Sequence, residues 1–470
     1  MNFADAVINQ ESRTENGMKA RKSTANSCVD LFYKIGASRG KNIVPDFVAA
    51  FVENKDLALR ISAWVRDVRG GAGERQIFRD ILLYLEKNSP EDCALLMHKI
   101  PELGRWDDYL IFETMKMKRV AFDSIKYALQ QDNGLCAKWM PRKGKVAHEL
   151  RTYLDWTPKF YRKRLVSLTS VVETQMCSKD WDNINFSHVP SVASSRYKKA
   201  FGRNTPKYGE YVEALVKGTD PKVKVNASAI FPHDVLKGRI GHYQSFNATE
   251  LDFIEKQWEA LPNYVGDNNV LPLVDVSGSM TCPAGKNTNV TCLDVAVSLG
   301  LYLADKNLGT FKDTFLTFSA RPELLNLKGR INQKIDQMVT SHWAMNTDLH
   351  AAFEKILSVA IKGNVPPSEM PDTLLILSDM QFDRCIRFDD SAIEMIKRKY
   401  ENAGYNIPKI VFWNLNASDN VPVKCNEKGV ALVSGFSPAI LATILGADAN
   451  DFTPEAMMLK VVMQDRYAVL

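Results

Sequence analysis

The sequence predicts two parts: a helical half over residues 1–265, followed by a doubly wound α/β domain over residues 266–470. Three observations predict this division. In the first half, apolar residues recur every three or four positions, as on one face of a helix. In the second half, short apolar runs alternate with helical patterns, which is typical of a sheet covered by helices. The charge also changes sign, from 41 Lys and Arg against 32 Asp and Glu in the first half to 19 against 23 in the second.

The helical half contains a series of short amphipathic segments joined by turns. Segments with helical spacing lie at residues 44–51, 57–68, 77–88, 92–100 and 120–129. No strand-like alternation interrupts this series, so we expect residues 1–265 to be almost entirely helical. Successive helix pairs without a strict sequence period are typical of a solenoid or ring of HEAT-like repeats, which share a shape more than a consensus.

Two turns in this half have unusual sequences. Residues 66–75 join two helices through three glycines, and a helix precedes them, so they are not a dinucleotide-binding fingerprint. One interpretation is a tight turn with glycines in left-handed conformations, and the other is that its free amides, with Arg69 and Arg75, bind a phosphate. Residues 104–108 favour a helix start that Asp107 or Asp108 helps to cap.

A basic window over residues 138–239 holds 20 basic and 9 acidic side chains, a net charge of +11. Cationic groups neutralise phosphates, and aromatic rings stack on unpaired bases. The window predicts binding to RNA, with a preference for an accessible single-stranded end, although solvated helix faces over an aromatic core would give the same pattern. The interleaved aromatic residues are Trp139, Trp156, Tyr161, Tyr197, Phe201 and Tyr208. The candidate RNA-binding residues are Lys138, Arg142, Lys143, Lys145, Arg162, Lys163, Arg164, Arg196, Lys198, Lys199 and Arg203.

The boundary between the two parts is predicted at a polar linker, residues 262–269. Before it, Asn247 and Glu250 have the spacing of a capping box that opens a helix ending near Leu261. Beyond it, we expect strands at residues 270–274, 314–318, 324–327, 373–378, 410–413 and 430–433. Helices are expected at residues 292–308, between the strand at 324–327 and the loop with Thr347, at residues 349–361 and 392–400, and at the end of the chain.

Oxygen-bearing side chains follow two of these strands. Asp275, Ser277 and Ser279 come after the first strand, at the carboxyl end where open α/β sheets place their ligand sites. Asp379 follows a later apolar run, and Thr347 lies in a loop before a helix. This order of motifs resembles the metal-ion-dependent adhesion site of von Willebrand factor A domains. In that site a strand is followed by Asp-x-Ser-x-Ser, a later loop carries a Thr, and a further strand is followed by an Asp.

This resemblance implies a role for each of the five residues. Ser277, Ser279 and Thr347 would contact the metal directly, and Asp275 and Asp379 would act mostly through water. A set of oxygen ligands with so little charge suits Mg²⁺ or Mn²⁺, which keeps several waters and takes its last ligand from a partner. That last ligand would be an acidic side chain of another protein.

Three stretches of the helical half are also similar to a known family. Residues 64–75, 104–108 and 189–201 resemble a family related to the Ro autoantigen (TROVE) proteins, with members in phages, plants and fungi. The resemblance implies a HEAT-like ring closed by a von Willebrand A domain, with single-stranded RNA ends bound in its hole and structured RNA on its basic outer face. It implies no enzymatic activity. The motifs differ from those of the better-studied Ro branch, so no RNA-contacting residue is matched position by position.

These features favour an RNA-binding scaffold, for noncoding RNA or RNA with a single-stranded end, that carries a Mg²⁺-dependent site for a partner. The alternative is a protein-binding adaptor or phage assembly protein that captures an acidic residue at the metal and binds no RNA. We expect no enzyme, because oxygen-ligated metal without a neighbouring base or nucleophile suits binding more than hydrolysis.

Composition limits the remaining possibilities. With 470 residues the chain is too long for one core, and 45% hydrophobic and 24% charged residues are ordinary for a soluble protein. We expect no membrane span and no signal peptide, because no long apolar run is present. Eight scattered cysteines without a C-x-x-C pair indicate reduced thiols and a cytoplasmic protein.

Overall fold

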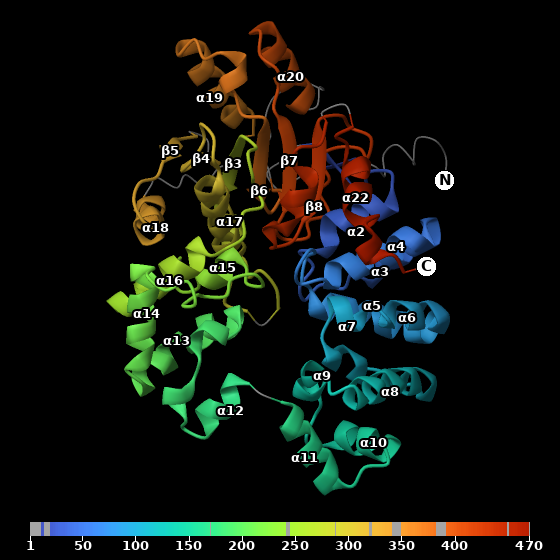
Figure 1. Cartoon of the computed structure of the whole chain (residues 1–470). Coiled ribbons are helices and arrows are strands. Elements are labelled where there is room, and N and C mark those ends of the chain that lie inside the picture. Colours follow the sequence, from blue (N-terminus) through green and yellow to red (C-terminus); the bar gives the residue numbers. More distant parts are fainter. Residues whose placement is uncertain are drawn as a thin grey trace.

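A computed structural model of the chain describes residues 11–13, 19–169, 171–240, 245–286, 288–318, 322–340, 349–381, 392–448 and 451–469. Its elements have the predicted order, with a helical half first and a sheet covered by helices second (Figure 1). The predicted fold class, α followed by α/β, is confirmed. In the described part of the chain, no helix combines the length and the apolar character needed to cross a membrane.

The helices of the first half form where apolar residues share one helix face, and some of them also begin after a capping side chain. The Asn54 side chain, for example, accepts a hydrogen bond from the amide of Leu57 at the start of α4, and Asn247 and Glu250 form the predicted capping box of α16. The helices are α2 (Ser27–Ile35), α3 (Val44–Glu53), α4 (Lys55–Arg66), α5 (Arg75–Asn88), α6 (Pro90–Met97), α7 (Ile100–Leu103), α8 (Met115–Gln130), α9 (Gly134–Trp139), α10 (Lys145–Tyr153), α11 (Pro158–Leu168), α12 (Val172–Cys177), α13 (Ser191–Asn204), α14 (Lys207–Lys217), α15 (Pro232–Val235) and α16 (Ala248–Glu259).

The helical half also contains one pair of short strands that the sequence does not indicate. Two three-residue strands, β1 (Glu11–Arg13) and β2 (Lys19–Arg21), pair antiparallel near the N-terminus. Strands this short show no readable alternation. Arg21 also exchanges backbone hydrogen bonds with Val421 of the second half, at 2.8 and 2.9 Å, so pairing with a distant segment stabilises a strand that the local sequence does not indicate.

The helices form two columns. From α2 to α11, helices that are near one another in sequence pack together and lead away from the sheet, and α12 to α16 lead back to it (Figure 1). The sheet domain and the two columns trace a ring in this view. The first column shares one continuous hydrophobic core with the sheet domain, whereas a smaller separate core joins α12, α13, α14 and α16.

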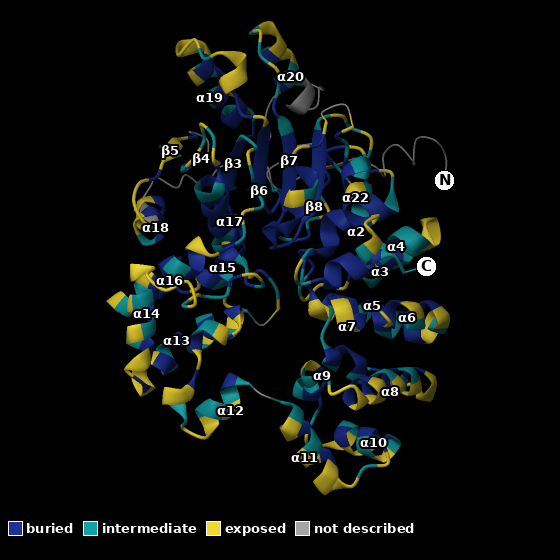
Figure 2. Ribbon diagram, viewed as in Figure 1, coloured by how far each residue is buried: buried dark blue, intermediate teal, exposed yellow. Residues whose placement is uncertain are grey.

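The second half contains one six-stranded sheet with the order β5-β4-β3-β6-β7-β8, in which only β5 is antiparallel to its neighbour. Its strands are β3 (Val270–Asp275), β4 (Thr314–Phe318), β5 (Leu324–Asn326), β6 (Thr373–Ser378), β7 (Lys409–Asn414) and β8 (Val430–Ser434). Its helices are α17 (Cys292–Lys306), α18 (Ile331–Thr340), α19 (Leu349–Lys362), α20 (Ala392–Asn402), α21 (Leu441–Ile444) and α22 (Pro454–Val462). All residues of β3 and β6 are buried, which explains why both read as continuous apolar runs (Figure 2).

The chain order places a switch point between β3 and β6. From β3 the chain builds β4 and β5 on one side, and then crosses to build β6, β7 and β8 on the other. The crevice at such a reversal, beyond the carboxyl ends of the strands, is where open α/β sheets hold their ligands. β3 ends at Asp275, and Asp379 directly follows β6.

The first helix of the described residues, α2, covers the last strand of the sheet. The Ser434 hydroxyl at the end of β8 donates to the backbone oxygen of Phe32 at 2.8 Å and accepts from the amide of Gly36 at 3.0 Å. A Cβ on Gly36 would lie 2.6 Å from the backbone oxygen of Ser434, so glycine permits this close approach. The helical half therefore packs directly on the sheet.

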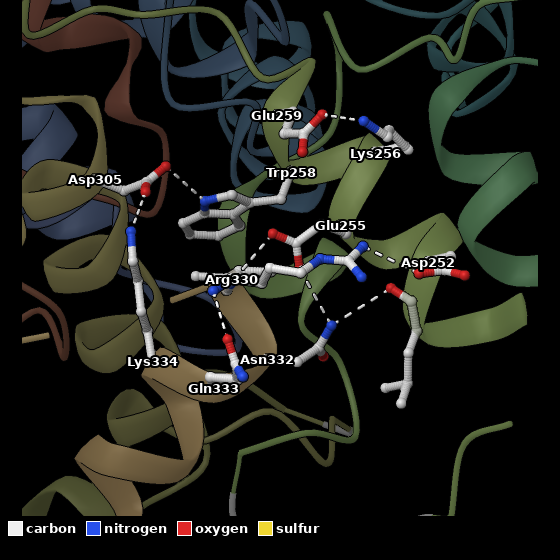
Figure 3. A network of polar contacts seen from close by, with 12 residues as sticks. Asp252, Glu255, Lys256, Trp258, Glu259, Asp305, Arg330, Asn332, Gln333 and Lys334 are labelled. Carbon is white, nitrogen blue, oxygen red and sulfur yellow. Dashed lines mark hydrogen bonds and ion pairs between the residues drawn. The ribbon is translucent and has the colours of Figure 1, made fainter. Parts of the chain in front are cut away.

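A polar network makes a second contact between the halves (Figure 3). The Trp258 indole of α16 donates to Asp305 of α17 at 3.0 Å, and the Lys334 ammonium of α18 lies 2.5 Å from the same carboxylate. Arg330 at the start of α18 lies 3.6 Å from Glu255 of α16. Because α16 ends the returning column, this network fixes the column to the sheet domain on the side opposite to α2.

Candidate functional site

The loop after β3 brings together the side chains that the sequence predicts as metal ligands. The Ser277 and Ser279 hydroxyl oxygens lie 3.0 Å apart, at the start of the short 3-10 helix η4 (Gly278–Thr281). One Asp275 carboxylate oxygen accepts from the amide of Ser277 at 2.9 Å. The other accepts from the Ser378 hydroxyl at 2.6 Å, and so ties the end of β3 to the end of β6.

Two carboxylates are buried at this point. Asp275 is 0% exposed and Asp379 is 1% exposed. Burial, together with the negative charge of Asp379, raises the pKa of Asp275 to about 7. A cation bound beside these two carboxyl groups and the two converging hydroxyls would offset both the burial and the mutual repulsion of the carboxylates.

Four of the five predicted metal-site residues are therefore described and lie together, and the fifth, Thr347, lies outside the described residues. Sequence reasoning missed Ser378. Its hydroxyl bonds Asp275 and accepts from the amide of Met380 at 3.0 Å. Ser378 could have been identified from the sequence because it is a small polar residue that ends an otherwise apolar run directly before Asp379.

The predicted basic window contains two exposed basic helix faces, one on α11 at the end of the first column and one on α13 in the returning column (Figure 2). Residues three and four positions apart share a helix face. On α11 the face carries Lys159, Arg162 and Lys163, and on α13 it carries Arg196, Lys199 and Arg203. Lys199 is half-buried and the other five are exposed, and none of the six has an ion pair with another described residue. Lys159 was not among the predicted residues.

Other predicted cations are partly or wholly engaged within the protein. Arg164 forms an ion pair with Asp132, and Lys145 lies 3.9 Å from Glu149. Arg142 donates to the backbone oxygen of Met140 at 3.2 Å. The remaining two predicted residues of this part of the window are Lys138, whose ammonium lies 5.5 Å from the centre of the Trp139 ring, and the exposed Lys143.

Lys198 is a correction to the predicted set. It is only 6% exposed, and its ammonium lies 5.4 Å from the centre of the Phe246 ring. Burial, with a further contribution from the charge of Lys199, lowers the pKa of Lys198 to about 8. Lys198 lies on the face of α13 that packs inward with Ser191, Ser194 and Phe201, so it does not point to a ligand.

The predicted stacking aromatics are also corrected. Tyr161 and Phe201 are 1% exposed and Tyr208 is 2% exposed, so none of them can stack on a base. Trp139 is covered by the Arg105 guanidinium, 3.7 Å from the ring centre. Tyr197 is half-buried, and its hydroxyl donates to Glu173 at 3.4 Å.

Sequence reasoning missed one exposed ring in the window. Phe160 is 50% exposed and lies on α11 among the basic residues of that face. In the sequence, Phe160 lies between Lys159 and the basic run at residues 162–164, and only this position indicated that its ring could be exposed.

The glycine turn at residues 66–75 is structural. Its amides are used within the turn: Gly71 donates to Asp67 at 3.1 Å, Ala72 to Trp64 at 3.3 Å and Glu74 to Val65 at 2.7 Å. A Cβ on Gly71 would lie 1.9 Å from the backbone oxygen of Trp64. These contacts favour the interpretation as a tight turn over that of a phosphate site.

The Gly-Arg-Trp-Asp-Asp motif at residues 104–108 starts a short 3-10 helix, η1 (Trp106–Leu110), in agreement with the predicted cap. The Asp108 carboxylate accepts from the amide of Arg105 at 3.0 Å. It also accepts from Arg66 at 2.8 Å and from Arg79 at 2.7 Å. The motif therefore joins three neighbouring segments of the first column.

Two family models match the chain. Residues 14–103 and 124–271 match a model described as a domain of unknown function (DUF2828), and residues 269–467 match a second domain of unknown function (DUF7788). The uncharacterized protein L728 of Acanthamoeba polyphaga mimivirus is 32% identical to this chain over 516 residues, which cover 96% of this chain and 87% of that protein. The chain belongs to the DUF2828 family.

One solved structure is similar to this DUF2828 protein over most of its length. The crystal structure of the Ro (RSR) protein of Deinococcus radiodurans aligns with 89% of this chain and 90% of that one, with a sequence identity of 14% and a TM-score of 0.36.

Proposed function

We propose that this DUF2828 protein is an RNA-binding scaffold whose basic faces on α11 and α13 hold the phosphate backbone of RNA. The observation that carries the proposal is that these faces hold six cations without an ion pair to another described residue, five of them exposed. Basic side chains that serve only to keep a protein soluble can form ion pairs with neighbouring acidic side chains without loss of function. A chain that leaves several cations without an ion pair on two of its helices favours a polyanion as ligand.

The RNA is held mainly through charge. Because Tyr161, Phe201 and Tyr208 are core residues, base stacking contributes little, and the single-strand preference that the sequence indicated loses most of its support. Phosphates are present in single-stranded and structured RNA alike, so the surface accepts both. The occupant is therefore a small structured RNA or an RNA with a single-stranded end.

The test is an anisotropy titration at low salt with three labelled RNAs of equal length: single-stranded, blunt duplex, and duplex with an overhang. We expect the three dissociation constants to agree within about fivefold, because the protein contacts backbone phosphates and all three RNAs carry them. If no RNA binds at low salt, the proposal is wrong, and an adaptor without RNA becomes the better account.

Lys198 and Lys199 provide a neighbouring pair of lysines with opposite expectations. Lys198→Met should change RNA affinity by less than about twofold, because the buried ammonium contacts no ligand. Lys199→Met should weaken binding by about three- to tenfold, since it removes one cation from the exposed face. Equal losses in the two variants would show that Lys198 reaches the RNA after all. Both are measured by the same titration.

We propose that the loop after β3, residues 275–281 (the metal loop), holds Mg²⁺ or Mn²⁺, with Ser277 and Ser279 as direct ligands and Asp275 and Asp379 acting through water. The bound ion would supply an open coordination position that a carboxylate of a partner protein can fill. The support is the buried pair of carboxylates beside the converging hydroxyls. We propose binding at this site and no catalytic step.

Asp275→Asn tests the metal proposal. The variant should bind Mn²⁺ about 10- to 100-fold more weakly, which is typical when a group that orients ligands through water is lost. Without metal at pH 8 it should melt above the wild type, because it removes one of two buried like charges. Electron paramagnetic resonance measures free Mn²⁺, and calorimetry measures the melting temperature.

The matched control is Asp372→Asn, an exposed carboxylate directly before β6, at the end opposite to the metal loop. Asp372→Asn should change neither the Mn²⁺ affinity nor the melting temperature. Unaltered Mn²⁺ affinity in Asp275→Asn would contradict the metal proposal and leave the RNA proposal intact.

A further inference from the structure

The segment that follows the metal loop folds back on itself as a short antiparallel pair. The Ala284 amide donates to the backbone oxygen of Val290 at 2.8 Å, and the Cys292 amide donates to that of Cys282 at 3.0 Å. Between them, Pro283 and Thr291 form an antiparallel bridge. The register therefore places Cys282 directly opposite Cys292.

The two thiols meet across this pair. Their sulfur atoms lie 3.5 Å apart. Directly opposed residues that share an antiparallel hydrogen bond have Cα atoms about 5.5 Å apart, close to the commonest separation in disulfides. A disulfide needs the sulfurs to approach to about 2.05 Å, which rotation of the two side chains can supply without movement of the backbone.

The two cysteines differ in access. Cys282 is partly exposed, whereas Cys292 is 0% exposed and its thiol donates to the backbone oxygen of Leu415 at 3.3 Å. A reagent in solution therefore reaches Cys282 first, and Cys292 lies behind it. This is the arrangement of an attacking thiol with a resolving thiol.

We propose that Cys282 and Cys292 form a reversible disulfide by exchange with a small disulfide such as oxidised glutathione. The Cys282 thiolate attacks one sulfur of the small disulfide, which forms a mixed disulfide and releases one small thiol. The Cys292 thiolate then attacks the Cys282 sulfur, which forms the internal bond and releases the second small thiol. The two cysteines lose two protons and two electrons, and the small disulfide is reduced to two thiols.

The bond would act on the metal loop. The Cys282 amide donates to the backbone oxygen of Ser279 at 3.2 Å, and Cys292 is the first residue of α17. A crosslink therefore ties the loop that carries Ser277 and Ser279 to the start of a buried helix. Bond formation itself requires neither RNA nor a metal, so this inference goes beyond the proposed function and fails or holds independently of it.

The test is to incubate the full-length protein in glutathione buffers of increasing oxidised fraction, trap free thiols, and map the peptides by mass spectrometry. We expect the Cys282–Cys292 crosslink, which lacks two hydrogen atoms, to exceed the mixed disulfide at Cys282 by at least about tenfold, because the second step is intramolecular. A reducing buffer should reverse it. Cys292→Ser should instead accumulate glutathione at Cys282, and Cys282→Ser should leave Cys292 unmodified.

Two further variants complete the design. Cys177→Ser removes an exposed cysteine of α12 and should not change the crosslink yield. Cys292→Ala repeats the Cys292→Ser experiment if circular dichroism shows that the serine variant does not fold. A wild-type protein that stops at the mixed disulfide, or that crosslinks only after denaturation, would overturn the proposal.

Discussion

Reversing the charge of either basic helix face should weaken RNA binding by at least about 100-fold at physiological salt. The α11 variant changes Lys159, Arg162 and Lys163 to Glu, and the α13 variant changes Arg196, Lys199 and Arg203 to Glu. Each replaces three attractive contacts to phosphate by three repulsive ones. The sites are solvent-facing or half-buried, so circular dichroism and melting temperature should stay near those of the wild type.

A matched control has the same change in net charge at a distance from the faces. Lys362, Lys424 and Lys428 are exposed residues of the sheet domain, and the triple change of these to Glu should reduce RNA affinity by no more than about tenfold through the general field of the protein. If the control loses as much affinity as the helix-face variants, net charge and not these faces determines binding. The measurement is the dissociation constant for one labelled RNA.

Arg466→Ala should lower the free energy of unfolding by about 3 kcal/mol at pH 7, because it leaves a buried carboxylate without its partner. Asp67 is 0% exposed and accepts two hydrogen bonds from the Arg466 guanidinium, at 2.5 and 3.0 Å. Tyr467 donates to the same carboxylate at 3.1 Å. This contact joins the end of α4 to the short helix η7 (Asp465–Tyr467) at the end of the chain, and so helps to hold the helical half on the sheet domain.

The same contact gives a pH dependence. Burial acts to raise the pKa of Asp67, but the hydrogen bonds from Arg466 and the amide of Arg69 outweigh it, so the pKa is lowered from 3.8. A lowered carboxyl pKa contributes stability above pH 3.8 that is lost as the pH falls through the folded-state value. The difference between wild type and Arg466→Ala should therefore be full above about pH 5 and shrink in more acidic solution.

Urea unfolding at several pH values measures this difference. Lys460→Ala, an exposed residue of α22, is the control and should change stability by less than about 0.5 kcal/mol at every pH. A difference for Arg466→Ala that stays constant down to pH 3 would contradict the assigned role of Asp67.

Much of the sheet domain could be predicted because its central strands are buried on both faces. β3 and β6 therefore appear in the sequence as continuous apolar runs, and the carboxylates that follow them mark the switch point. The capping box at Asn247 located α16 for a similar reason, since its two hydrogen bonds need only residues three positions apart. Local chemistry determines these features, so the local sequence reveals them.

The basic window was less predictable because the sequence gives the composition of a helix but not which face packs inward. Lys198 and Lys199 are adjacent and chemically identical, yet only Lys199 lies beside Arg196 and Arg203 on the outer face of α13. The burial of Tyr161 and Phe201 likewise depends on neighbouring helices. Ser378 was missed because its role exists only when β3 and β6 lie side by side.

The salt dependence of RNA binding tests the central claim most directly. For the wild type and for the α11 and α13 faces neutralised to Ala, the logarithm of the dissociation constant is measured against the logarithm of salt concentration with single-stranded RNA. We expect a steep straight line for the wild type, and a slope smaller by about 2 for each neutralised face, since each of three lost phosphate contacts contributes about 0.7. Equal slopes for wild type and both variants would show that these cations contact no phosphate, and would contradict the account.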